Sequence, residues 1–404
     1  MNLRCLSLTR NNKNICIWVI AMIRMRAGEC AWPLRWLILL LPLLCWKAQA
    51  NGLFDPEDGM LDMSRYLLDN QYGFLPVPVV ITEPAVGYGG GLFGLFLHGK
   101  GKREGERFVP PPISAFGGGG TQNGTWFVGG GHRHTWQDDH IRYLVAGGYA
   151  DINLDIYTGD VIGFGRNKAI NTETKGYGGM QKLLFRLGDT PVFLGASQFW
   201  AKMDISAKNN PVIDNIWKRV LGESSTSSAF GIVAEYDTTD NLFWPSRGVS
   251  LSGEYQLYGG ALGGDYQYDL LTLDGKTFLP LNPTWTLALA GNYQSLSHQD
   301  NHLPPMARPY IALRGISRYR YQGNDVATVQ TQLAWQATPR WIIQGFIGAG
   351  SAADTSSDLF HTAEVAWGTG FRYLIAREYG LRTGVDIAFS DNEQAVYFNV
   401  GSGL

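Results

Sequence analysis

The sequence predicts an all-β protein that forms a closed, transmembrane, antiparallel β-barrel, and three observations carry this prediction. The chain of 404 residues is rich in glycine, with 51, is 13% aromatic, and has only 17% charged residues. Strand-length segments alternate apolar and polar residues, as barrel strands do when they face lipid on one side and water on the other. After residue 50, no apolar stretch is long enough for a transmembrane helix. A chain of strands can cross lipid only as a closed barrel, because lipid cannot satisfy the backbone groups of an open sheet edge.

The N-terminal region carries an export signal. Arg35 precedes a short apolar run from Trp36 to Trp46, and the small-residue sequence Ala48-Gln49-Ala50 follows. This order of charge, apolar core and small residues is typical of a cleaved secretory signal peptide. We therefore expect residues 1–50 to be a signal peptide that is cleaved after Ala50. Translation is expected to start at Met22 or Met25, so that residues 1–21 would be a misassigned start.

Cysteine usage and charge agree with export and exclude one class of partner. All four cysteines lie in the first 50 residues, at positions Cys5, Cys16, Cys30 and Cys45. The mature chain would contain no thiol, which suits an oxidising periplasm. It would have 26 basic and 34 acidic residues, a net charge of −8. This acidic balance is not that of a nucleic-acid-binding protein.

Residues 51–83 are expected to form a short periplasmic segment ahead of the barrel. Asp55 is followed by a proline and two acidic residues, a pattern that favours the start of a helix, and we expect a small helix over Leu61 to Asn70. The segment would be either a solvated tail or, alternatively, a plug at the mouth of the barrel.

Residues 84–404 divide into strand-length segments separated by polar turns. Near the end of the chain, Val385, Ile387 and Phe389 alternate with polar or small residues such as Asp386. Fifteen segments are predicted as strands: 84–98, 113–121, 125–136, 141–157, 172–187, 192–207, 225–239, 248–259, 266–279, 284–298, 325–337, 341–352, 362–375, 380–390 and 394–402. Since bacterial single-chain barrels have even strand numbers, we expect sixteen strands, with one more before residue 300.

Two motifs resemble the barrel of the BamA/TamA outer-membrane family, the bacterial surface antigens. The run YDTTDNLFWPSRG, from Tyr236 to Gly248, is similar to the strand-turn signature YDxRDxxxxPxxG of that family, with Asp237, Asp240, Pro245 and Gly248 at its matching positions. The run LRGISRYRYQGN, from Leu313 to Asn324, resembles the conserved loop of the family. Together with the segment Gly368 to Arg372, the resemblance covers roughly residues 84–404.

The resemblance implies a sixteen-stranded barrel in which the loop between strands 11 and 12 folds back into the lumen. Arg314 would reach an acidic residue on the inner wall. The chain departs from the family at the strand where relatives often have Phe-x-Asp-x-Gly, because it has Phe346-Ile347-Gly348-Ala349-Gly350. Glu364 and Asp386 are therefore the candidate partners of Arg314. The matching loop positions are Arg314, Gly315, Arg318, Tyr319, Arg320 and Gly323.

The resemblance also implies a place in the cell and a set of partners. The chain looks like the stand-alone branch of the family, which lacks polypeptide-transport-associated domains. We expect it in the bacterial outer membrane, in contact with outer-membrane lipids and, during its biogenesis, with the barrel assembly machinery. Tyr397 to Val400 resemble the terminal strand signal that this machinery reads, although the chain ends in Leu404.

Other motifs are better explained by structure than by chemistry. Gly89 to Gly94 match the dinucleotide pattern GxGxxG, but no βαβ unit surrounds them, so we expect a glycine-rich strand and no cofactor. His132-Arg133-His134 could hold a metal, but a hydrated strand end explains it more simply, and we assign no metal site. Ser297 and His298 are adjacent on a strand and point to opposite faces, so they cannot act together, and no catalytic residue is assigned.

Three functions remain for such a barrel. The first is a protein or solute translocation or insertion barrel that is gated by the Arg314 loop, with no enzymatic activity. The second is a passive diffusion pore, and the third is a lipid hydrolase on the barrel wall. The client or solute is not encoded in any motif that we recognise.

Overall fold

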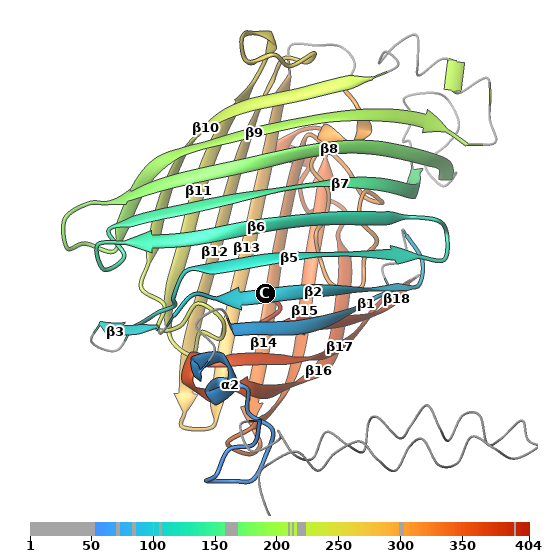
Figure 1. The fold of residues 1–404 in the computed structure, drawn as a ribbon. Coiled ribbons are helices and arrows are strands. Elements are labelled where there is room, and N and C mark those ends of the chain that lie inside the picture. Colours follow the sequence, from blue (N-terminus) through green and yellow to red (C-terminus); the bar gives the residue numbers. More distant parts are fainter. Residues whose placement is uncertain are drawn as a thin grey trace, which may run out of the picture. The chain divides into compact units, whose positions relative to one another are not determined.

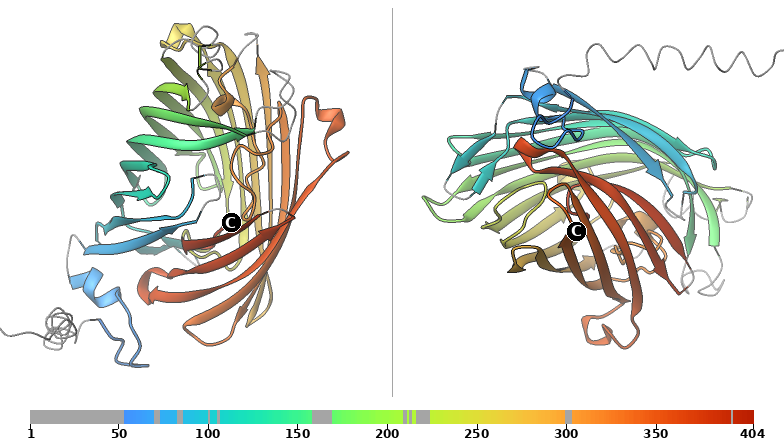
Figure 2. Two further views of the ribbon diagram at one scale, coloured as in Figure 1. Left: turned by 90° about the vertical axis from the view of Figure 1, so that its right-hand side faces the viewer. Right: turned by 90° about the horizontal axis from the view of Figure 1, so that it is seen from below.

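Sixteen antiparallel strands form one strongly curved sheet in the computed structural model (Figures 1 and 2). The structure describes residues 53–404 except 70–72, 83–85, 100, 105–106, 158–168, 209–210, 212–213, 216–223, 299–302 and 392. The expected signal peptide, residues 1–50, lies outside the described residues. Each strand pairs with the next along the chain, in the order β1, β2, then β5 to β18. The fold predicted from alternation, a sixteen-stranded antiparallel barrel, is confirmed.

The elements follow one another in a simple meander. They are the helix α2 (Ser64–Asp69), the strands β1 (Gly73–Ile81), β2 (Gly89–Leu97), β3 (Lys102–Glu104), β4 (Arg107–Val109), β5 (Ile113–Thr121), β6 (Trp126–Trp136), β7 (Ile141–Tyr157), β8 (Ala169–Arg186), β9 (Val192–Ala207), β10 (Ser225–Asp237), β11 (Gly248–Tyr258), β12 (Tyr268–Asn282), β13 (Trp285–His298), β14 (Asp325–Gln336), β15 (Trp341–Ala353), β16 (Glu364–Ala376), β17 (Leu381–Ser390) and β18 (Gln394–Val400), and the short 3₁₀ helices η4 (Gly260–Leu262), η5 (Pro305–Ala307), η6 (Ser356–Asp358) and η7 (Arg377–Tyr379).

The strand that the sequence reading lacked is β1, with the sequence GFLPVPVVI. Pro76 and Pro78 lack a backbone N–H, which argues against a central strand, but β1 is one of the two terminal strands of the sheet, where proline is tolerated. The first strand was therefore expected at residue 84, whereas the barrel sheet begins at Gly73. The hairpin of β3 and β4 was also not expected, and it forms a separate two-stranded sheet.

The two faces of the sheet differ in chemistry. On β15 and β16, Ile343, Ile347 and Trp367 are exposed on the outer face. On the alternate positions of the same strands, Gln344 and Arg372 are buried on the inner face. This is the alternation that barrel strands show, with lipid outside and a polar lumen inside. Among the described residues, no helix combines the length and apolarity that crossing a membrane requires.

The N-terminal segment ends in a shorter helix than the sequence suggested. α2 begins at Ser64, whose backbone N–H donates to Asp62 Oδ1 over 2.7 Å. The expected helix-start residue, Asp55, instead accepts the backbone N–H of Glu57 and closes a turn. The prediction of a helix starting at Leu61 was wrong by three residues because the aspartate nearest the helix satisfies its first free N–H group.

β1 and β18 lie side by side without a continuous ladder of backbone pairs. Within the described part of the chain, the hydrogen bonds between them join the side chain of Thr82, just after β1, to the backbone of Val396 in β18. Every other neighbouring pair of strands in the barrel sheet is held by a register of seven or more residue pairs. The boundary between β1 and β18, which we name the seam, is the weakest connection in the sheet.

Candidate functional site

A long loop between β13 and β14 folds back against the inner wall. Its described part is a hairpin, in which Tyr310 bridges Gln322 and the N–H of Ile311 donates to the carbonyl of Tyr321 over 3.0 Å. Ile311, Leu313 and Ile316 are buried, and they cluster with Val326 of β14 and Ala366 of β16. Burial of these apolar side chains provides the driving force that holds the loop inside the barrel.

The wall beneath this loop lacks side chains where the loop passes. A Cβ atom on Gly350 of β15 would lie 2.6 Å from a side-chain carbon of Ile311, and one on Gly348 would lie 3.1 Å from Leu313. The glycines of the Phe346 to Gly350 strand therefore make room for the loop. This gives a physical reason for glycine at the position where relatives often have aspartate.

Arg314 lies at the tip of the loop and is held by three groups of the inner wall. Its Nη1 donates to Asp386 Oδ2 over 2.8 Å, and its Nη2 donates to Gln332 Oε1 over 2.9 Å. The guanidinium carbon lies 3.6 Å from the centre of the Phe346 ring, a cation–π contact. Of the two acidic candidates, the structure thus brings Asp386 to Arg314, while Glu364 interacts with Tyr321 of the same loop.

Asp386 is the centre of a buried polar cluster on β17. Its side chain is fully buried and receives a two-pronged hydrogen bond from Arg372, over 2.7 Å and 2.8 Å. Gln344 Nε2 donates to Oδ1 over 3.0 Å, and Asn399 Nδ2 donates to Oδ2 over 2.7 Å. One carboxylate therefore serves two guanidinium groups, and this arrangement, which we name the lumen cluster, carries one excess positive charge. Paired buried arginines favour such planar two-pronged contacts.

Other positions of the loop motif form hydrogen bonds with β18 and with the turn between β17 and β18. Gly315 has a φ of +97°, and its N–H donates to the hydroxyl of Tyr397 over 3.0 Å. Arg320 Nη1 donates to Glu393 Oε1 over 2.6 Å, and the backbone N–H of Ser317 donates to the same carboxylate. The remaining positions interact within the loop: Tyr319 packs against Tyr310, Gly323 donates its N–H to the carbonyl of Pro309, and Arg318 interacts electrostatically with Tyr319.

Several members of this site were not assigned to it from the sequence. Arg372, Gln332 and Gln344 occupy inward positions on β16, β14 and β15, and Glu393 lies between β17 and β18. The sequence did offer one signal for them, because polar residues occupy the inward-facing positions of three neighbouring strands. Which of them meet could not be read from one sequence, because the relative height of strands in a barrel depends on register.

The strand-turn motif forms a second ionic cluster. This cluster lies at the end of the barrel opposite to the turn that connects β17 and β18. Asp237 Oδ2 lies 3.0 Å from Nη2 of the buried Arg142, which also pairs with Asp139 at 2.5 Å. Asp240 accepts the backbone N–H of Ser246 over 2.8 Å. Pro245 lies in this turn, and Gly248 has a φ of +105°, with no room for a Cβ against the carbonyl of Thr238. The motif thus closes a turn and fixes Arg142.

The N-terminal segment is attached to the turns between β14 and β15 and between β16 and β17. Arg340 is almost fully buried, and its guanidinium donates to Asp55, Asp58 and Asp62, over 2.6, 2.6 and 2.5 Å. Burial alone would lower the pKa of Arg340, but the hydrogen bonds from this guanidinium to Asp58 and Asp62 outweigh it and raise the pKa. We name this arrangement the clasp.

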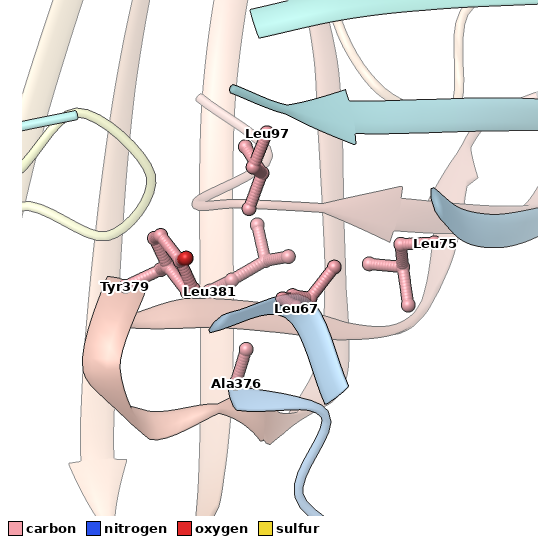
Figure 3. Packing of buried hydrophobic residues seen from close by; sticks show 6 residues of the cluster. All are labelled: Leu67, Leu75, Leu97, Ala376, Tyr379 and Leu381. Carbon is pink, nitrogen blue, oxygen red and sulfur yellow. The ribbon is translucent and has the colours of Figure 1, made fainter. Parts of the chain in front are cut away.

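Apolar packing completes the clasp (Figure 3). Leu67 of α2 packs with Leu75 of β1 and Leu97 of β2 on one side, and with Tyr379 and Leu381 of η7 and β17 on the other. The helix therefore contacts strands from both sides of the seam. Neither the triad of aspartates nor this packing was predicted, since both bring residues near the N-terminus against residues that follow β14.

The motifs that were set aside lie on strands. Gly89 to Leu97 form β2, and His132 and His134 lie on β6 with 3.4 Å between Nε2 and Nδ1. Ser114 Oγ lies 2.8 Å from both His98 Nε2 and His132 Nδ1, a contact that was not expected. Within the described ranges, no group of three or more metal-binding side chains is placed to hold an ion.

Comparisons with known proteins agree with the architecture. Residues 154–312 match the model of the Omp85 superfamily domain, a stretch that contains the strand-turn motif and ends two residues before Arg314. No curated protein matches the sequence.

Solved structures share the fold. BamA from Haemophilus ducreyi lacking POTRA domains 1–3 is similar with a TM-score of 0.54 and 12% identity, over 82% of this chain and 70% of that one. CdiB from Acinetobacter baumannii gives 0.52 and 10%, over 81% and 59%, and CdiB from Escherichia coli gives 0.54 and 11%, over 80% and 61%. The chain thus spans less than two thirds of the CdiB chains, and at these identities the likeness is one of fold.

Proposed function

We propose that this chain, which is a BamA/TamA-like outer-membrane β-barrel with an Omp85 superfamily domain, is a translocation or insertion barrel whose lumen is controlled by the Arg314 loop. In its resting state, the loop lies inside the barrel and narrows the lumen. Release of Arg314 from Asp386 would free the loop and open a path for a polypeptide or a solute. The chain would act mechanically and electrostatically, without a catalytic step.

The observation that carries the proposal is the contact of Arg314 with the fully buried Asp386. A buried carboxylate that lacks a cation is costly, and breaking a buried ion pair costs about 3–5 kcal/mol. Because Arg372 also binds Asp386 over 2.7 Å, the carboxylate stays paired if Arg314 leaves. The loop can therefore detach at a smaller cost than an isolated ion pair would impose, which suits a gate that opens reversibly.

The seam supports the insertion form of the proposal. β1 and β18 are joined within the described residues by the side chain of Thr82 on the backbone of Val396. Both strands are sheet edges whose unpaired backbone groups can bind another strand. Separation of β1 from β18 would break few hydrogen bonds and would expose two edges on which a client strand could pair.

Conductance in planar bilayers tests the gate. We expect the intact protein to show low conductance, and Arg314→Ala to raise it severalfold, because the loop loses its charged contact with the wall and leaves the lumen. Arg65→Ala is the matched control, since Arg65 is an exposed arginine of α2 outside the lumen cluster. The proposal fails if Arg314→Ala conducts like the intact protein.

These recordings and a separate lipid assay test the other two hypotheses. Steady, large openings of the intact protein would favour a passive diffusion pore. Hydrolysis of phospholipid by the purified protein would favour a lipid hydrolase, for which Ser114 between His98 and His132 would be the first residue to replace.

The organisation of the whole precursor is part of the proposal. Residues 1–50 would be removed on export, the part of residues 51–83 that precedes β1 would lie in the periplasm, and β1 together with residues 84–404 would span the outer membrane. The apolar outer face, with residues such as Ile347 and Trp367 exposed, would contact outer-membrane lipids. The barrel assembly machinery would insert the chain, and its client or solute would be met in the lumen or at the seam.

A further inference from the structure

An apolar pocket lies on the inner wall, away from the lumen cluster. Its volume is about 330 Å³, and its lining comes from β2 and β6 to β9, together with Met306 from the loop between β13 and β14. Small-molecule sites commonly measure about 300–1,000 Å³ and are mainly apolar, with a few polar groups. No residue of the lumen cluster lines this pocket, and an apolar hollow is unexpected on a wall that faces water.

Glycines form the floor of the pocket. Gly148 of β7 is paired with Gly129 of β6 on one side and with Gly178 of β8 on the other, and all three line the hollow. Because none of them has a side chain, three adjacent strands present bare backbone to the lumen at this height. The backbone groups of these central strands are already paired with the strands on either side.

Apolar side chains form the walls and a cover. Phe93 and Phe127 stack with 6.2 Å between ring centres on one side, and Ile152 and Met203 lie toward the other. Met306 contributes from the loop, so the pocket is formed in part by the segment that carries Arg314. The pocket crosses from β2 to β9, five interstrand spacings, or about 24 Å at about 4.8 Å per spacing.

One polar atom in the lining lacks a partner. Thr174 is 3% exposed, and its Oγ1 has no hydrogen-bond partner among the described residues. A buried hydroxyl without a partner costs about 1–3 kcal/mol, so it is usually explained by a missing group. An elongated apolar ligand with one polar end would pack against the apolar walls and form a hydrogen bond with this hydroxyl.

We propose that the pocket on the inner wall of β2 and β6 to β9 binds a single acyl chain, with Thr174 Oγ1 as a hydrogen-bond partner for its polar end. A hydrocarbon chain brings no hydrogen-bonding groups to a floor whose backbone is already paired. An extended peptide would bring one donor and one acceptor per residue and would leave them unsatisfied there. The acyl chain would also pack against Met306 and so stabilise the inward position of the loop.

Photolabelling tests the proposal on the intact barrel in lipid nanodiscs. The probe is palmitic acid with a terminal diazirine, and labelled residues are mapped by mass spectrometry. We expect labels on the inward-facing Phe127, Ile152 and Met203, and competition by unlabelled palmitate. Labels found only on outward-facing residues such as Val128 and Tyr177, which any lipid would reach, would overturn the proposal.

Two variants and one control sharpen this test. Ala150 lines the pocket with its side chain directed into it, so Ala150→Phe should fill the hollow and reduce inward labelling by about tenfold, equivalent to about 1.4 kcal/mol. Ala146→Phe, on the same face of β7 but outside the lining, should label like the intact protein. Met306→Ser changes only the loop, and it should also reduce inward labelling. Unchanged inward labelling in both Ala150→Phe and Met306→Ser would overturn the proposal.

A second probe identifies the source of the acyl chain. A phosphatidylethanolamine with the same diazirine at the end of one acyl chain is placed in the nanodisc. Inward labelling by either probe supports an acyl-chain site, and the more efficient probe shows whether free acid or membrane lipid supplies the chain. If neither probe labels the inner wall while an apolar peptide with a diazirine does, the pocket is a peptide site and the proposal is wrong. Because photolabelling does not measure conductance, a negative result would overturn the acyl-chain site without contradicting the proposed gate.

Discussion

Single glycines on the inner wall decide where the charged residues can lie. Gly370 of β16 is opposite Asp386 of β17, and a Cβ atom built on it would lie 1.9 Å from Asp386 Oδ1. The lumen cluster therefore requires both a carboxylate at 386 and an empty position beside it. Sequence reasoning about charges alone would have overlooked the second requirement.

Replacement of this glycine should damage the cluster. Gly370→Ala must displace the Asp386 carboxylate from Arg372 and Arg314. We expect this variant to lower the free energy of unfolding by about 1–3 kcal/mol, the usual cost of overpacking. Urea unfolding followed by tryptophan fluorescence measures this change. Gly345→Ala on β15 is the control, since its Cβ would come no closer than 3.9 Å to the carbonyl of Gly368. Equal stability of the two variants would contradict the requirement for space at Gly370.

At the scale of elements, the clasp joins the N-terminal segment to the turns between β14 and β15 and between β16 and β17 by charge and by packing. The hydrogen bond from Arg340 lowers the pKa of Asp58 from 3.8 to about 2. Burial raises the pKa of Asp62, but hydrogen bonds from Ser64 and Arg340 outweigh it, and the pKa is lowered. Both aspartates are therefore more readily ionised in the clasp than in a detached segment.

These directions predict how the clasp responds to acid. A group with a lowered pKa in the folded state stabilises that state above its ordinary pKa, and the stabilisation disappears as pH falls toward the folded-state value. The clasp should therefore be intact at pH 7 and should loosen as pH falls from about 4 to about 2. Limited proteolysis between residues 53 and 69 across this range measures the loosening.

A neutral variant provides the comparison. Arg340→Gln should be cleaved in this segment already at pH 7, with little further change in acid, because the aspartates have lost their main partner. Arg65→Ala, which alters an exposed residue of α2, should behave like the unaltered protein. A clasp that resists protease equally at pH 7 and pH 2 would show that apolar packing around Leu67 alone holds the segment.

For the whole molecule, the proposed function predicts two places where the barrel would open, the seam and the loop. Because no cysteine follows Cys45, an engineered pair would contain the only cysteines of residues 51–404. Thr82 and Val396 are in hydrogen-bond contact across the seam, so Thr82→Cys with Val396→Cys should form a disulfide there.

Such a disulfide tests whether the seam must open. In cells depleted of the unaltered protein, we expect the oxidised double variant to fail to restore the outer-membrane protein and lipid profile, and a reductant to restore it. Each single cysteine variant should complement with and without reductant. Full complementation by the oxidised, cross-linked barrel would rule out opening at the seam and leave transport through the lumen.

The order of strands was determined by the sequence alone. Local alternation and polar turns placed fifteen strands within a few residues of their observed bounds, because each barrel strand repeats the same two-residue pattern. The strand β1 escaped this reasoning because Pro76 and Pro78 are compatible with a strand only at a sheet edge, and the edges are known only once the sheet is assembled. The motif around Leu313 to Asn324 located the loop, and the requirement for a carboxylate reduced its partners to two.

Only the tertiary structure decided which residues meet. Asp386, Arg372, Gln344 and Arg314 come from three strands and a loop, and their meeting depends on the register between strands, which one sequence does not encode locally. The three aspartates on Arg340 and the acyl-chain pocket under Met306 depend equally on segments that are distant along the chain. A periodic pattern specifies which face a side chain occupies, whereas closure of the sheet specifies its neighbours across the lumen.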